Sequence, residues 1–363
     1  MKIMSLLLLL LSTTLWSESI KFKIDYEYAT SEHDDITSNS SRTSVNVIYI
    51  NNITSKLKIN SKLTAEKYCN AMLNKYAGSK DRSNETHFLI QTLYLQYKAT
   101  ENISIMIGTI PILGERLEDS DNSSSGANGL KQMVGTVTDS IVINTNYNDF
   151  KTTIGLGCFM CINNQIGSYA VEKAKNSVGM WIFNNKKYEK MEFDLDYYEM
   201  KFLLNGEDYS YLKSGGFGIK YDDTEYSGIT LYSSLAISEY EESYSLIPYK
   251  KEIGQSFLLG VNIDSDIVSK YVYEFKYGIE YYSSSEYWTN MTTNNYLNIF
   301  DDNVRGNFYS LYLNISPIKS LSIDLKYNKN YIDYITSAKN THLNPVSVDM
   351  KVNSYSVRVN YKF

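Results

Sequence analysis

The C-terminal segment Met350–Phe363 constrains the fold most, because apolar and polar residues alternate along it, without a break from Ser354 to its end. Successive side chains of a β-strand point to opposite faces, so this alternation separates the residues into two faces. The apolar set is Tyr355, Val357, Val359, Tyr361 and Phe363, and the polar set is Ser354, Ser356, Arg358, Asn360 and Lys362. The segment therefore predicts a strand with one face toward lipid and the other toward water.

Residues 1–19 have the order of a secretory signal peptide. Lys2 precedes the apolar run 6–11, and small polar residues follow it. The run is much shorter than the roughly 18–20 residues that a spanning helix needs. Cleavage is expected after Ser17 or Ser19. Because this region has no cysteine, a lipoprotein anchor is not expected. No later apolar run approaches spanning length, so we expect an exported chain that is periplasmic, secreted or a β-barrel.

Composition favours a membrane barrel over a large soluble core. The chain has 34 tyrosines and 4 prolines, and its mean hydropathy is negative. Aromatic girdles and a wet interior would account for both features. The three cysteines, Cys69, Cys158 and Cys161, are too few for a disulfide framework. Cys158 and Cys161 have the spacing of a redox or metal motif, but on a strand that spacing puts them on opposite faces, so we expect neither chemistry.

Strand-like stretches of about ten residues recur along the whole chain and predict sixteen strands. Their expected ranges are 20–29, 42–51, 54–65, 86–98, 101–110, 138–147, 150–160, 178–184, 190–203, 211–221, 225–238, 254–263, 270–283, 306–316, 320–333 and 350–363.

The lengths of the connections alternate in the way that a membrane barrel requires. Those after even-numbered strands are tight, for example Asn148–Asp149 and 317–319, and those after odd-numbered strands are mostly long. Short turns at one rim and long loops at the other are typical of the periplasmic and extracellular ends of such a barrel. A soluble sandwich gives no reason for loop length to follow strand parity.

Parity within the strands predicts which face meets the lumen. In 20–29 the apolar set Phe22, Ile24, Tyr26 and Tyr28 alternates with charged residues, and 54–65 repeats this split with Leu57, Ile59 and Leu63 against lysines and Asn60. A lysine facing lipid near the bilayer centre would cost about 2–4 kcal/mol, so the charged set is expected to face the lumen. The aromatic residues of 270–283, from Tyr271 to Tyr281, are expected in the girdle.

Sixteen strands leave an aqueous channel unless a segment enters it, whereas eight strands are filled by side chains. The longest connection, 111–137, follows the fifth strand and is rich in Gly, Ser and Asn. In strand number, loop order and the final aromatic residue, the chain resembles the sixteen-stranded general porins of Gram-negative outer membranes. That resemblance implies a homotrimer, a third extracellular loop that narrows the pore, and Phe363 as the signal for the barrel insertion machinery.

The resemblance also implies a set of pore residues. On the loop, Glu115, Glu118, Asp119 and Asp121 would form the acidic side of a constriction. The wall opposite would supply the basic residues Lys23, Arg42, Lys56, Lys58, Lys62 and Arg358. Opposed charges of this kind orient dipolar solutes and tune ion preference. The alternative is that the acids lie on a solvated surface loop and the basic residues line a wide vestibule. Thr109 follows Gly108 where porins of this type often have an arginine.

Other chemistries have little support. Asp119, Asp121 and Ser123 alternate like the start of a calcium loop, but the expected glycine and glutamate are missing, so no metal or cofactor is expected. None of the three histidines, His33, His87 and His342, adjoins a nucleophile motif, so we expect no catalysis. The formal net charge of −6 also makes a nucleic-acid partner unfavourable.

The sequence therefore predicts an all-β transmembrane barrel over 20–363, after a signal peptide 1–19, in the outer membrane of a Gram-negative bacterium. Its expected function is passive diffusion of ions and small hydrophilic solutes, with outer-membrane lipid around it. A non-conducting surface barrel that acts as adhesin or receptor through loops 67–85, 162–177, 239–253, 284–305 and 334–349 is the alternative. A channel selective for a sugar or organic acid is a third possibility.

Overall fold

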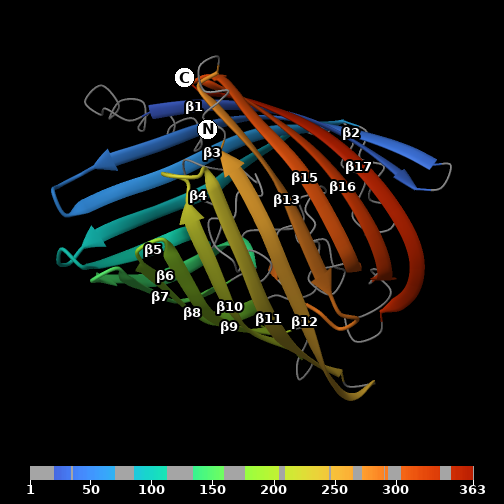
Figure 1. Cartoon of the computed structure of the whole chain (residues 1–363). Coiled ribbons are helices and arrows are strands. Elements are labelled where there is room, and N and C mark those ends of the chain that lie inside the picture. Colours follow the sequence, from blue (N-terminus) through green and yellow to red (C-terminus); the bar gives the residue numbers. More distant parts are fainter. Residues whose placement is uncertain are drawn as a thin grey trace.

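The computed structural model describes residues 20–33, 36–69, 86–112, 134–158, 176–203, 209–244, 247–264, 272–289, 291–292, 304–335 and 345–362. Nearly all of them form strands (Figure 1). The strands are β1 Ile20–His33, β2 Ile36–Asn52, β3 Leu57–Cys69, β4 Thr86–Lys98, β5 Ile103–Ile112, β6 Val134–Tyr147, β7 Phe150–Cys158, β8 Asn176–Tyr188, β9 Met191–Leu203, β10 Tyr209–Asp223, β11 Ile229–Tyr244, β12 Ile247–Asp264, β13 Glu274–Ser284, β14 Met291–Thr292, β15 Val304–Ile318, β16 Leu321–Ile335 and β17 Val346–Lys362.

Sixteen of these strands form one closed antiparallel barrel, as the sequence predicts. Each wall strand pairs with its neighbours in the chain, and β14 is the one strand outside this order. The first and last strands close the ring, since Tyr26 of β1 lies opposite Val359 of β17 as well as Thr43 of β2. Closure satisfies the backbone hydrogen bonds of every wall strand, which is the condition for crossing a membrane with strands.

The tight turns lie where the sequence places them, with small shifts. Asn148 and Asp149 have φ values of 47° and 61°, so they form a two-residue turn with both residues in the left-handed region. The prediction of a turn over 185–189 was wrong, because β8 continues to Tyr188 and the chain reverses at Glu189, whose φ is 51°. The turn between β10 and β11 also falls later than predicted, since β11 begins at Ile229.

The predicted long loop 239–253 is mostly strand. β11 continues to Tyr244 and β12 begins at Ile247, so the two strands form a hairpin that extends beyond the range expected for a spanning strand. Its pairs include Glu241 opposite Lys251 and Glu242 opposite Lys250. Charged residues are typical of loops, but here opposite charges face each other on paired strands, and such pairs stabilise a hairpin.

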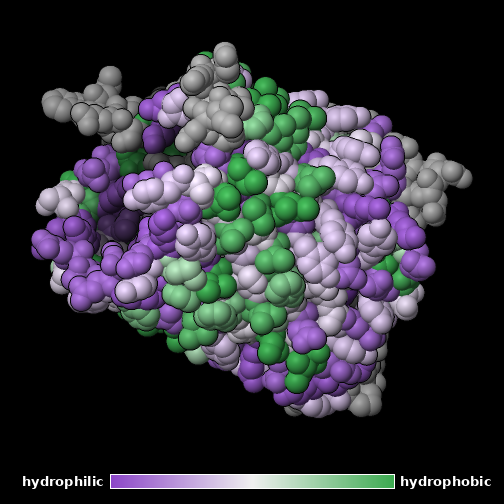
Figure 2. Space-filling view, in the orientation of Figure 1, coloured by the Kyte–Doolittle hydropathy of each residue, from purple (hydrophilic) through white to green (hydrophobic). Residues whose placement is uncertain are grey.

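The two faces follow the predicted parity. Phe22, Tyr26 and Tyr28 are 40–45% exposed, whereas Lys23 and Asp25 between them are almost fully buried. Figure 2 shows hydrophobic residues gathered in a band across the visible wall, with hydrophilic residues toward its ends. The outward set therefore forms the lipid-facing belt of the barrel.

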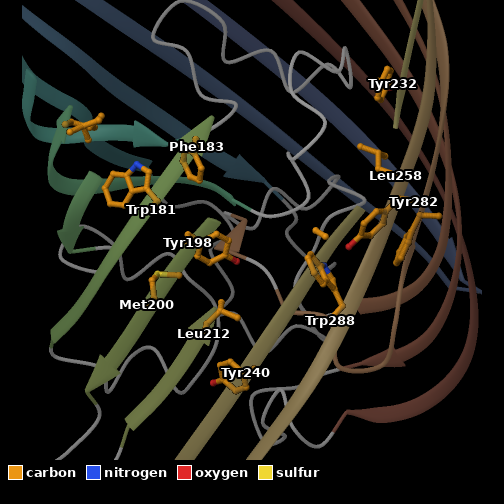
Figure 3. Packing of buried hydrophobic residues seen from close by; sticks show 14 of the residues in the cluster. Trp181, Phe183, Tyr198, Met200, Leu212, Tyr232, Tyr240, Leu258, Tyr282 and Trp288 are labelled. Atoms are coloured by element: carbon orange, nitrogen blue, oxygen red, sulfur yellow. The ribbon is translucent and has the colours of Figure 1, made fainter. Parts of the chain in front are cut away.

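The inner face of the wall carries an apolar cluster, which extends from the extracellular half down to Tyr232 near the periplasmic start of β11. Its residues come from many strands and face inward, as the view in Figure 3 shows for part of the set. The cluster is Ile110, Val142, Trp181, Phe183, Tyr198, Met200, Leu212, Tyr232, Ala236, Tyr240, Leu258, Tyr282, Trp288, Phe308 and Ile332. Among the described residues, no helix is long and apolar enough to cross a membrane.

Candidate functional site

The inner face near the short-turn, periplasmic rim carries a charged cluster on β1, β2, β3 and β17. Asp25 is its centre, because its carboxylate lies 3.2 Å from the Lys23 ammonium and 3.7 Å from the Arg358 guanidinium. Asn46 donates a hydrogen bond to the other Asp25 oxygen at 2.8 Å, and Thr64 donates to Asn46 at 2.7 Å. Residues of four strands therefore position one carboxylate between two cations.

Lys62 adds a further cation to this side of the lumen. It lies on β3 with the inward-facing Asn60 and Thr64, and its side chain is only 4% exposed. Lys58, two residues from Asn60, is partly buried on the same parity. We name Lys23, Lys62 and Arg358 with Asp25 the basic cluster: Lys23 and Arg358 contact the carboxylate, and Lys62 lies on the same inner face of the wall, on β3.

An acidic cluster lies on β9 at a similar distance from the periplasmic rim. Asn185 of β8 donates hydrogen bonds to Glu192 at 2.7 Å and to Asp194 at 2.8 Å, and the Asn184 amide donates to Asp196 at 3.2 Å. Asp194 and Asp196 are each 5% exposed. β1 is the first and β9 the ninth of sixteen strands around the ring, so the acidic cluster faces the basic cluster across the lumen.

A third polar group lies on the wall between these two clusters. The Tyr232 hydroxyl donates to Glu280 at 2.5 Å, across two strand intervals. Tyr232 can span them because Gly260 of the intervening β12 has no side chain; a Cβ there would lie 2.1–2.4 Å from the Tyr232 ring. The tyrosine therefore lies flat against the wall and leaves the lumen beside it free of its bulk.

The predicted pore residues have different positions in the structure. Lys23 and Arg358 lie together on the inner wall beside Asp25, and Lys62 and Lys58 share the inward parity of β3. Lys56 is exposed in the turn before β3, because the strand starts at Leu57 rather than at residue 54. Arg42 lies on β2 opposite Glu27 and Tyr68.

The remaining predicted site residues lie outside the described residues. They are the loop acids Glu115, Glu118, Asp119 and Asp121, the terminal Phe363 and the signal segment 1–19. Sequence reasoning missed the central role of Asp25 and the facing position of the β9 acids. The parity of Asp25 could have indicated its inward side, but its partners on β2 and β17 depend on the pairing of distant strands.

The described part of the chain contains no candidate metal site, but one of its cysteines is in a disulfide. No group of three or more His, Cys, Asp or Glu residues there could hold a metal ion. Cys158, at the extracellular end of β7, is disulfide-bonded. At the opposite rim, a hydrogen bond to the Asp223 carboxylate raises the pKa of Lys190 and fastens the β8–β9 turn to the end of β10.

The closed sixteen-stranded wall, its apolar outer belt and its polar inner face define the class as an outer-membrane β-barrel. Such a barrel belongs to the outer membrane of a Gram-negative bacterium. Most extracellular connections are longer than the periplasmic turns, although only two residues separate β1 from β2 and β11 from β12.

Comparison with solved structures identifies this fold as that of the outer-membrane porins. The anion-selective porin of Comamonas acidovorans matches with a TM-score of 0.56 and 12% identity, over 95% of this chain and 99% of the porin. OmpF of Salmonella typhi matches with a TM-score of 0.58 and 12% identity, over 95% and 97% of the two chains. OmpT of Vibrio cholerae in its trimer form gives 0.53 and 11%, over 95% and 99%. No protein-family model and no curated protein sequence matches the chain.

Proposed function

We propose that the protein is a porin that lets ions and small hydrophilic solutes diffuse passively across the outer membrane. The observation that carries this proposal is a sixteen-stranded wall whose inner face near the periplasmic rim is lined with charged and amide side chains. A barrel of this size is wide enough for an aqueous path, and such a lining hydrates it. The proposed function is therefore passive transport of solutes and not catalysis.

Planar-bilayer recording tests this function directly. The detergent-extracted protein is reconstituted, and single-channel current is recorded in symmetric KCl, followed by the reversal potential across a KCl gradient. Stepwise openings are expected, and the sign of the reversal potential gives the ion preference. Openings in groups of three would support a homotrimer, the assembly named for the Vibrio OmpT crystal form. An inserted, folded and silent protein would contradict the channel.

We further propose that the connection 111–137 narrows the pore through Glu115, Glu118, Asp119 and Asp121, opposite the basic wall residues. One described feature supports an inward course at its end. Val134 and Gly135 extend β6 beyond its last pair with β5 and instead pair in parallel with β14. A deletion of 115–125 should then raise the conductance and weaken the ion selectivity. Unchanged conductance would mean that these acids lie outside the pore.

A non-conducting surface barrel is the second candidate, and one observation favours it. Tyr198, Met200 and Leu212 face inward in the extracellular half and are at most 1% exposed, so this part of the lumen is filled beside β9 and β10. If the filling were complete, the extracellular connections would carry the function. The same recording separates the two functions, since only the porin conducts. For both, we propose that Phe363 directs insertion and that outer-membrane lipid surrounds the belt.

A further inference from the structure

The connection from β13 to β15 begins by turning back onto its own barrel wall. The Ser285 amide donates a hydrogen bond to the Gln255 carbonyl at 2.9 Å, and the Gln255 amide donates to the Ser285 hydroxyl at 2.9 Å. The Trp288 amide then donates to the Ser285 carbonyl at 3.0 Å, which closes a tight turn. This reciprocal pair fixes the start of the connection to β12.

Trp288 then lies on the inner face of the wall. A Cβ at Gly254 of β12 would come within 2.2–2.3 Å of the Trp288 backbone N and Cα, so the connection rests directly on the bare backbone of that glycine. Gly254 shares the inward parity of Ser256 and Leu258, which are both buried. Trp288 itself is 1% exposed and belongs to the inner apolar cluster (Figure 3). Burial of an indole is one of the larger hydrophobic contributions a single side chain makes.

Two polar contacts hold the same segment from neighbouring strands. The Thr289 amide donates to the Ser238 hydroxyl of β11 at 3.0 Å, and the Arg305 Nε–H donates to the Trp288 carbonyl at 2.8 Å. Arg305 is fully buried, although it is the second residue of β15. The register shifts between Arg305 and Gly306, and Gly306 has a φ of 144°, so a bulge re-aims the guanidinium inward.

Beyond Thr289, the next described residues of this connection form β14. Met291 and Thr292 form β14 and pair in parallel with Val134 and Gly135 at the start of β6. β6 is the sixth strand of the ring and β13 the thirteenth, so the two ends of this contact belong to nearly opposite walls. Met291 is two residues beyond Thr289, which is hydrogen-bonded to β11, so it lies within about 7 Å of Thr289. The start of β6 therefore meets β14 close to the inner surface of β11.

We propose that Ser285–Thr289 and β14 form an internal strap that crosses and narrows the extracellular half of the lumen. Trp288 and Arg305 act as its positioning residues, and Gly254 is the site on the wall where it rests. The strap is a second size-limiting element, independent of the acids in 115–121, and its role in permeation rests on the proposed porin function. Its contacts come from four strands, β6, β11, β12 and β15, so it joins opposite walls of the barrel.

Cross-linking tests the position of the strap without any measurement of current. Val134→Cys with Met291→Cys places thiols at directly paired residues, and mass spectrometry of the folded protein should find the linked peptides after mild oxidation. The control pair is Met291→Cys with Tyr226→Cys, because Tyr226 is 75% exposed in a periplasmic turn. A link in the control pair alone, or none at 134–291, would overturn the strap whatever the protein conducts.

Conductance tests its effect on the pore. Trp288→Ala removes the anchor, and we expect single-channel conductance to rise roughly 1.5-fold or more, because current follows the open cross-section. Trp181→Ala is the matched control, since this indole is equally buried on the inner wall, over Gly155, but lies outside the strap. Equal increases in both variants would overturn the narrowing role, because only lost volume would matter.

A second pair of variants keeps this test valid if Trp288→Ala folds poorly. Gly254→Val pushes the strap off the wall, whereas Gly215→Val has its nearest neighbouring atom at 3.8 Å. Conductance should rise in Gly254→Val alone, and an unchanged value would overturn the narrowing role. A silent wild-type protein would contradict the proposed porin function, while the 134–291 link would still decide where the strap lies.

Discussion

At the residue scale, glycines of the wall allow large aromatic side chains to lie flat inside the barrel. A Cβ at Gly155 would meet the Trp181 ring at 2.0–2.7 Å, and one at Gly278 would meet the end of the Tyr312 side chain at 2.2–2.4 Å. Each pair lies on neighbouring strands, so the aromatic covers the gap that the glycine leaves. This arrangement increases packing without filling the lumen.

Gly260→Ala should destabilise the barrel by about 1–3 kcal/mol, the range for overpacking a tight site. The added methyl group would push the Tyr232 ring away from the wall and lengthen its hydrogen bond to Glu280. Urea unfolding in lipid vesicles, followed by tryptophan fluorescence, measures the loss. Gly215→Ala is the control, because its Cβ has ordinary contacts at 3.8–3.9 Å. An equal loss in both variants would assign the cost to the strand backbone instead of the tyrosine contact.

At the element scale, each wall strand has one face fixed by lipid. Leu235 of β11 is 59% exposed and lies between Phe217 and Phe257 on the adjacent strands, so it is inside the apolar belt. Leu235→Arg should cost about 2–4 kcal/mol near the bilayer midplane. Urea unfolding and the yield of folded, heat-modifiable barrel measure this change. Tyr226→Arg, in an exposed periplasmic turn, should change neither, and comparable losses would mean that β11 does not meet lipid there.

The same periodicity explains which features of the fold can be predicted from the sequence. Alternation over residues such as Phe22 to Tyr28 determines strand type and inward face, because each strand must satisfy both lipid and water locally. Strand ends are predicted less well: β11 and β12 continue into a hairpin whose paired residues are charged and whose inner face buries Tyr240 and Glu242, so the apolar alternation ends before the strand does.

The internal strap leaves no periodic signal at all. Its contacts join Trp288 to Gly254 and Arg305, Thr289 to Ser238, and β14 to β6, over separations in the chain that only the folded barrel brings together. The Asp25 network has the same character, since Arg358 reaches it from the opposite end of the chain. Of the candidate site, the inward lysines could therefore be predicted from parity, whereas their partners and the charges across the lumen could not.

At the scale of the whole molecule, the order of the strands around the barrel places basic and acidic side chains on opposite sides of the pore. The basic cluster on β1, β3 and β17 has two cations in contact with Asp25 and a third, Lys62, on the same inner face, and the acidic cluster on β9 lies half a ring away. Both lie near the periplasmic rim and below the strap, and the apolar cluster reaches down to the level of the acidic cluster, where Phe183 is paired with Asp196. A solute would therefore pass a narrowed extracellular half first and then a transverse field made by the wall itself.

Removing one charge from either cluster should shift ion selectivity in opposite directions. Asp194→Asn takes a negative charge from the lumen and should shift the reversal potential toward anions, whereas Lys62→Gln should shift it toward cations. One charge at contact distance in water is worth about 1 kcal/mol, so each permeability ratio should change by a few-fold at most. Reversal potentials across a KCl gradient measure both shifts, and high salt should reduce them by screening.

Glu225→Gln provides the matched control for Asp194→Asn. It removes one negative charge as well, but at an exposed periplasmic turn. Its reversal potential should stay at the wild-type value. If all three variants gave the same potential, ions would not sense the wall clusters, and selectivity would have to arise elsewhere along the path. If Asp194→Asn alone had an effect, Asp25 would already neutralise the basic side, because it lies within 3.7 Å of both Lys23 and Arg358. The two wall variants together therefore distinguish a transverse field from a single acidic ion site.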